Sequence, residues 1–90
     1  MKFEWDRKKS ESNLRKHGIS FEEASLIFEG TRLSWTDDRC DYGETRTVSI
    51  GLIHGLVAVV VVHTDRQGST RIISARLASH RERKRFDDHQ

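Results

Sequence analysis

Proline is absent from this sequence, cysteine occurs once, and no apolar run is long. Because neither proline nor a low-complexity tract marks a linker, we expect a single domain over residues 1–90. Cys40 cannot form an internal disulfide and no signal-peptide pattern is present, which indicates a protein of the reducing cytoplasm. The longest apolar run, Leu56 to Val62, has seven residues and is far too short to span a bilayer.

Charge is plentiful and sorted along the chain. Charged residues make up 33% of the sequence, yet the formal net charge is only +2. The ends are basic and the middle is acidic, and between residues 71 and 85 Glu82 is the only acid among six cations: Arg71, Arg76, Arg81, Arg83, Lys84 and Arg85. If the two ends meet in space, they form a positive surface of the kind that binds phosphate backbones. The alternative is that these cations form an ordinary solvated helix face.

The first third of the chain predicts a short strand and two helices. Phe3 and Trp5 alternate with polar residues, as in a strand. Asp6 can cap a helix that runs to about His17 and stops at Gly18. The segment from Ser20 to Glu23 is a capping box, and the helix that it opens should end at Gly30.

From residue 31 the apolar period changes to two, which predicts strands. Arg46 shares a predicted strand face with Val48, Ile50 and Leu52, and residues 57–62 are nearly all β-branched, as at the centre of a sheet. Glycine-containing turns are expected at 37–43, 54–55 and 67–68. A last strand over 71–77 leads to a second capping box, Ser79 to Glu82, which opens a basic helix. The predicted order is β-α-α-β-β-β-β-α with an antiparallel meander as its centre, so the predicted fold class is α+β.

Four segments in order carry a family resemblance: Phe3-Glu4-Trp5-Asp6, the block from Asn13 to Ala24, Gly43-Glu44-Thr45-Arg46, and Arg71-Ile72-Ile73-Ser74-Ala75-Arg76. Together they resemble the BrnT family of type II toxins over nearly the whole chain. The resemblance implies a RelE-like fold, which is a small antiparallel sheet with two N-terminal helices on one side and a C-terminal helix. The activity that it implies is that of a ribonuclease that blocks translation. It also implies a cognate BrnA antitoxin with a ribbon-helix-helix part, through which the complex binds operator DNA and represses its operon.

Metal-independent RNA cleavage by the 2′-hydroxyl needs a base, an acid and cations around the phosphorus. Arg76, at a strand end, is the first candidate for phosphate stabilisation, although it could instead form a salt bridge with Glu82. Arg46 is the second, with a structural pairing to Glu44 or Asp41 as the alternative. His63 is the best-placed titrating group, but it could equally be bonded to backbone.

The remaining candidates concern RNA contacts and proton transfer. We expect RNA to contact the following basic residues: Lys16, Arg71, Arg81, Arg83 and Arg85. His17 is expected to be structural, and Glu82 is a capping residue that could also act as a base. Phe86 stands near the position where many BrnT-like chains have a tyrosine, and its ring has no hydroxyl to donate.

The spacing of the histidines excludes the common zinc patterns, so we expect no metal or cofactor. Two function hypotheses remain. One is an endoribonuclease toxin; the other is a non-catalytic basic module that holds an acidic partner or RNA.

Overall fold

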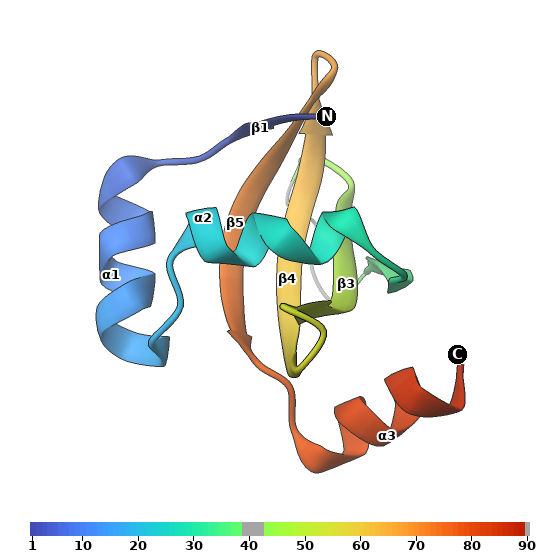
Figure 1. Ribbon diagram of the computed structural model, residues 1–90. Helices are drawn as coiled ribbons and strands as arrows, with labels where there is room; N and C mark the ends of the chain where they lie inside the picture. Colours follow the sequence, from blue (N-terminus) through green and yellow to red (C-terminus); the bar gives the residue numbers. More distant parts are fainter. Residues whose placement is uncertain (39–42, 90) are drawn as a thin grey trace.

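A five-stranded sheet with helices on both faces forms the protein (Figure 1). The computed structural model describes residues 1–38 and 43–89. The elements in chain order are β1 (Lys2–Glu4), α1 (Arg7–His17), α2 (Phe21–Ala24), the 3₁₀ helix η1 (Ser25–Glu29), β2 (Leu33–Asp37), β3 (Arg46–Ile53), β4 (Val57–Arg66), β5 (Ser69–Leu77) and α3 (His80–Asp88). The fold is therefore α+β, as the sequence predicts.

The sheet has the strand order β1-β5-β4-β3-β2, and the strands from β2 to β5 form the predicted antiparallel meander. Its turns at His54-Gly55 and Gln67-Gly68 have positive φ at both residues, which suits the right-handed twist of hairpin strands. One detail differs from the prediction, because β1 pairs parallel with the start of β5. Three helices and three strands separate β1 from β5 in the chain, so the two strands cannot form a hairpin.

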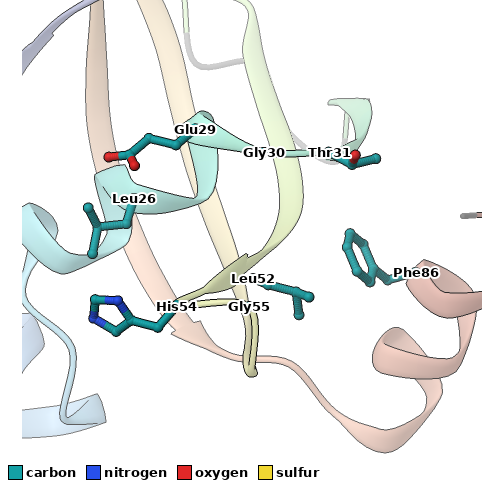
Figure 2. A pocket seen from close by; sticks show the side chains of 8 residues that line it. All are labelled: Leu26, Glu29, Gly30, Thr31, Leu52, His54, Gly55 and Phe86. Atoms are coloured by element: carbon teal, nitrogen blue, oxygen red, sulfur yellow. The ribbon is translucent and has the colours of Figure 1, made fainter.

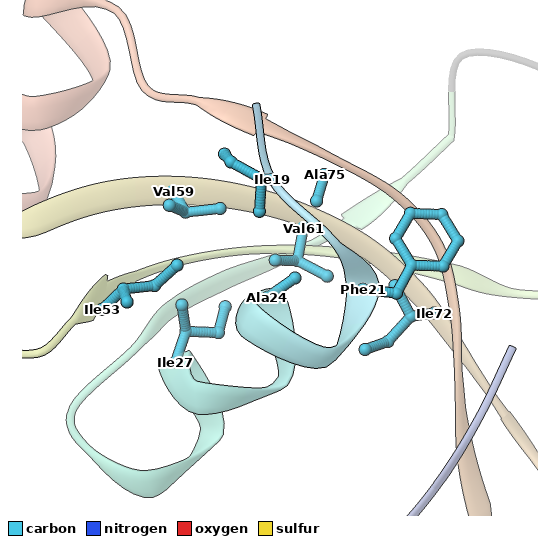
Figure 3. Packing of buried hydrophobic residues seen from close by; sticks show 9 residues of the cluster. All are labelled: Ile19, Phe21, Ala24, Ile27, Ile53, Val59, Val61, Ile72 and Ala75. Carbon is cyan, nitrogen blue, oxygen red and sulfur yellow. The ribbon is translucent and has the colours of Figure 1, made fainter. Parts of the chain in front are cut away.

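Alternating side chains of β4, the central strand, enter two separate cores. Val59 and Val61 pack with Ile27 and the other residues of the first core, under α2 and η1 (Figure 3). Val60 packs on the opposite face with Phe86 of α3, which is only 2% exposed. The basic α3 is thus held to the sheet by one aromatic side chain, which explains why so polar a helix docks at all.

The predicted helix over residues 21–30 is correct at its start and only partly correct beyond it. Ser20 and Glu23 form the capping box, but the α-helix ends at Ala24 and continues as η1. The Ser25 hydroxyl donates to the Glu22 carbonyl at 2.6 Å, a local bond that competes with the α-helical ladder. Gly30 has extended backbone rather than the left-handed conformation of a common helix stop.

Helix α1 has the predicted cap at Asp6 and stop at Gly18, yet it is anchored by polar groups. Leu14, the apolar residue of its sequence, is 47% exposed, whereas Asn13 is buried. The Asn13 amide donates to the Ala75 carbonyl at 2.8 Å and accepts from the Ala75 N–H at 3.3 Å. These two bonds satisfy the backbone N–H and C=O of Ala75, beyond the point where β1 stops pairing with β5. The Asn13 amide therefore makes the hydrogen bonds that a neighbouring strand would otherwise make.

We predict that Asn13→Ala lowers the free energy of unfolding by about 2–4 kcal/mol, because it leaves buried backbone groups of Ala75 without partners. Urea denaturation measures the change. Asn13→Asp should also destabilise, since it keeps the acceptor but loses the donor, whereas Glu11→Ala on the exposed face of the same helix should change little. Equal stability of Asn13→Ala and Glu11→Ala would contradict this role.

Gly51→Ala should destabilise the protein by about 1–3 kcal/mol through overpacking. A Cβ at Gly51 would lie 2.7 Å from the Ile27 Cβ and 3.3 Å from the Ile27 carbonyl oxygen, so η1 would have to move off the sheet. Gly30→Ala is the matched control, because a Cβ there meets nothing within 4 Å. Urea denaturation measures the free energy of unfolding of both variants. An unchanged value for Gly51→Ala would contradict the prediction and show that η1 can shift freely.

Candidate functional site

The α3 side of the sheet is covered only in part. α3 lies over the part of this face that carries Ile50 and Val60. Beside it runs a cross-strand row formed by Trp35, Val48, Val62 and Ser74. A cleft of about 310 Å³ opens over this row. Its lining residues are Trp35, Thr36, Asp37, Asp38, Val48, Val60, Val62, Ser74, Arg76 and Glu82.

Arg76 and Glu82 form one wall of the cleft. β5 presents Arg76, and the capping box places Glu82 in the first turn of α3, where its carboxylate also accepts from the Ser79 N–H at 2.8 Å. Two parallel bonds join the Arg76 guanidinium to the two Glu82 oxygens, at 2.7 and 2.8 Å. The salt bridge that the sequence offered as an alternative is therefore present, and it fixes the orientation of the guanidinium.

This pair also fixes the charge state of Glu82. The hydrogen bonds from Arg76 lower the pKa of the Glu82 carboxyl to about 2, against a smaller opposing effect of burial. A carboxylate with so low a pKa takes up almost no proton near neutral pH. The geometry therefore favours Glu82 as the residue that orients Arg76 over Glu82 as a general base.

Arg46 and Arg71 lie beyond the opposite border of the cleft. In β3, Arg46 shares the face of Val48 and Ile50, as predicted, and it is the cross-strand neighbour of Asp37. Arg71 pairs with Thr64 in the next row of β5 and β4, and its guanidinium is 4.0 Å from Glu4. Arg46 and Arg76 thus point to the same face of the sheet, on either side of the row that floors the cleft. Asp41, a proposed partner of Arg46, lies outside the described residues, as does Cys40.

Trp35 joins the cleft to the basic helix. The Arg85 guanidinium lies over the Trp35 ring, 4.8 Å from its centroid, a cation–π contact between α3 and β2. Neither Trp35 nor Asp37 was a site candidate from the sequence, where Asp37 was assigned to the turn. In fact Asp37 ends β2 and is only 7% exposed. The signal was there: Asp37 continues the period-two alternation of Leu33 and Trp35.

His63 lies on the other side of the sheet. Its ring packs edge-on against Phe28 of η1, with centroids 4.9 Å apart, and its Nε2 is 2.8 Å from the Ser49 hydroxyl. Burial lowers the pKa of His63, which keeps the imidazole neutral near pH 7. His63 and Arg76, which the sequence predicts as catalytic residues, therefore do not face one cleft, because successive residues of β4 point to opposite faces.

The other basic candidates are spread over the surface. Lys16 and His17 end α1, which packs on the α2 side of the sheet, away from the cleft. Arg81 is exposed in the first turn of α3. Arg83 has structural contacts: its guanidinium binds Asp87 at 3.1 Å and the Leu56 carbonyl at 3.0 Å, which ties α3 to the β3–β4 turn. Arg85 of α3, in contrast, contacts the cleft wall at Trp35.

A second, larger cavity of about 430 Å³ lies between η1, the β3–β4 turn and α3 (Figure 2). Leu26, Leu52 and Phe86 supply its apolar lining, and Glu29 and His54 stand at its sides. It contains no guanidinium or lysine, so it offers little to a phosphate. Phe86 contributes a phenyl ring and no proton donor.

Within residues 1–38 and 43–89, no group of three or more histidine, cysteine or acidic side chains is arranged to hold a metal ion. In the same part of the chain no helix is long and apolar enough to cross a membrane.

Comparison with known proteins shows the family to which the chain belongs. The family model described as "Ribonuclease toxin, BrnT, of type II toxin-antitoxin system" matches residues 5–82. No match was found among curated proteins. The fold is similar to the 1.1 Å crystal structure of the Brucella abortus ribonuclease toxin BrnT, with a TM-score of 0.66 and 25% sequence identity over 89% of this chain and 99% of that one. The chain belongs to the BrnT family of ribonuclease toxins of type II toxin–antitoxin systems.

Proposed function

We propose that this toxin is a metal-independent endoribonuclease that cleaves cytoplasmic RNA by attack of a 2′-hydroxyl on the adjacent phosphorus and so inhibits translation. A BrnA-type antitoxin with a ribbon-helix-helix part neutralises it and carries the complex to operator DNA. The family description supports the ribonuclease chemistry, and the RelE-like kinship is part of the same proposal.

The observation that carries the proposal is the placement of arginines on both borders of one cleft. Arg76 stands on one border, held in a fixed orientation by Glu82, and Arg46 stands in the row beyond the other. Fixed guanidinium groups stabilise the charge that builds on a pentavalent phosphorus without a metal ion, and preorganised charge is usually the largest catalytic contribution. Arg71 and Arg85 extend the cation pattern along the two borders, where adjacent phosphates of a bound strand would lie.

RNA binding must compete with the Arg76–Glu82 pair. The guanidinium is already engaged by a carboxylate, and a phosphate either displaces that carboxylate or binds beside it. Arg81 and Arg83 on α3 are placed to bind the strand after it leaves the cleft, whereas Lys16 could contact only RNA that wraps around to the α2 side. Stabilisation by the arginines, rather than proton transfer by Glu82 or Phe86, is therefore the centre of the mechanism.

Arg76→Ala should lower RNA cleavage measured in EDTA by about 10²–10³-fold, the usual cost of removing one donor that stabilises transition-state charge. Arg76→Lys should recover only part of the rate, because an ammonium cannot make two parallel bonds to phosphate oxygens. Lys8→Ala, which removes an exposed cation of α1 on the other side of the sheet, is the control and should keep most activity.

The assay follows single-turnover cleavage of a labelled RNA, with urea denaturation to confirm that each variant is folded. A cell-free translation reaction with the same proteins should show inhibition in proportion to cleavage. Intact RNA in EDTA, together with a tight complex with the antitoxin, would favour a non-catalytic basic module instead.

His63→Gln should leave the cleavage rate within a few-fold of wild type, because His63 faces η1 rather than the cleft. Glutamine can still bond to the Ser49 hydroxyl, so the fold should persist. A loss of more than about 100-fold, the effect expected for a general acid or base, with an unchanged unfolding curve, would place the reaction on the α2 side of the sheet.

A further inference from the structure

The cleft has an apolar floor between an aromatic side and a charged side, and we refer to the space between them as the slot. Three valines that are neighbours across β3 and β4, Val48, Val60 and Val62, form its floor. Trp35 stands on the β2 side, and the Arg76–Glu82 pair stands on the other. An apolar floor with a few polar groups at the edges is typical of sites that bind planar ligands. Trp35 adds an aromatic side chain to the lining, and the Arg85 guanidinium covers one face of its ring.

The charge of the lining shows which part of an RNA fits inside. The described lining contains three carboxylates, those of Asp37, Asp38 and Glu82, and one guanidinium, that of Arg76. A phosphate within this lining would meet like charge, whereas a neutral group rich in N–H donors would meet acceptors. The slot therefore suits a nucleobase, with the phosphates outside it on the arginines of the borders.

Asp37 narrows the choice of base. Its side chain is almost buried, lines the slot and comes from the last residue of a strand, so its position is fixed. Asp37 already has contacts within the protein, but an ionised carboxylate offers about four acceptor sites. Two adjacent donors on one edge satisfy a carboxylate best, and guanine alone among the four RNA bases has them, at N1–H and the N2 amine. The Watson–Crick edges of adenine and cytosine place an acceptor beside a single amine, and uracil has one N–H between two carbonyls.

We propose that this cleft is a guanine-binding subsite in which Trp35 and the valine floor pack against the base and Asp37 accepts from its N1–H and N2 amine. The inference deepens the proposed function, because it makes Asp37 the residue that sets the cleavage preference of the ribonuclease. It predicts that cleavage is fastest next to guanosine.

Nucleotide binding tests the subsite without any cleavage. In a Trp5→Phe background the fluorescence of Trp35 is the only tryptophan signal. Guanosine 3′-monophosphate should quench it with an affinity at least about tenfold higher than inosine 3′-monophosphate, which lacks the N2 amine, and higher still than the adenosine, cytidine and uridine nucleotides. Equal affinities across the five nucleotides would overturn the proposal without any need for a variant.

Asp37→Asn then tests the residue. The amide presents a donor as well as an acceptor, so the ratio of guanosine to inosine affinity should fall toward one. Asp65→Asn, which removes an exposed carboxylate outside the cleft, should keep the wild-type ratio. An unchanged ratio in folded Asp37→Asn would remove Asp37 from base recognition.

Cleavage of RNAs that carry a single guanosine separates this inference from the proposed function. Guanosine-selective quenching with RNA left intact would retain the subsite and reject the nuclease. Cleavage at the same rate with or without guanosine would retain the nuclease and reject the subsite.

Discussion

The pleat of β4 is the constraint on which the rest of this molecule depends. Because β4 is the central strand and helices pack on both faces of the sheet, its side chains from Val59 to Val62 alternate between two cores. Val59 and Val61 belong to the side of η1, and Val60 belongs to the side of α3. The same alternation assigns His63 to one face and leaves Arg76, the cross-strand neighbour of Val60, on the other. No local change of side-chain rotamer can bring His63 and Arg76 together, since the sheet lies between them.

The two faces are closed to different extents, and this difference creates the site. On the α2 side, an apolar core under α2 and η1 is completed by the polar anchor of α1 at Asn13. On the α3 side, one short helix with one buried aromatic residue covers only part of the sheet. The row beside α3 contains the buried Val48 and the half-buried Val62, and charged side chains stand on both of its borders. An apolar floor between cations is what a nucleic-acid strand can use, because bases and phosphates need different surroundings.

Local chemistry made much of the fold predictable. Both capping boxes, the stop at Gly18 and the glycine hairpins depend on residues close together in sequence, and the structure confirms them. The β1–β5 pairing could not be predicted, because it joins segments more than 60 residues apart by backbone bonds that leave no side-chain pattern. The site was predictable to a similar degree: strand alternation placed Arg46 on the face of Val48, but Asp37 looked like a turn residue. The alternation of Leu33 and Trp35 extends to Asp37, but its pairing with Arg46 across the sheet is known only from the structure.

The position of Arg76 ties the candidate site to the stability of α3. Glu82 orients the guanidinium, and Glu82 is itself fixed by the capping box at the start of α3. That helix is anchored to the sheet chiefly through Phe86, one turn further on. A change that loosens Phe86 would therefore disturb the geometry of Arg76 without touching the cleft. A partner that binds α3 could act on the site in the same way, because the helix that covers the core also holds the cation.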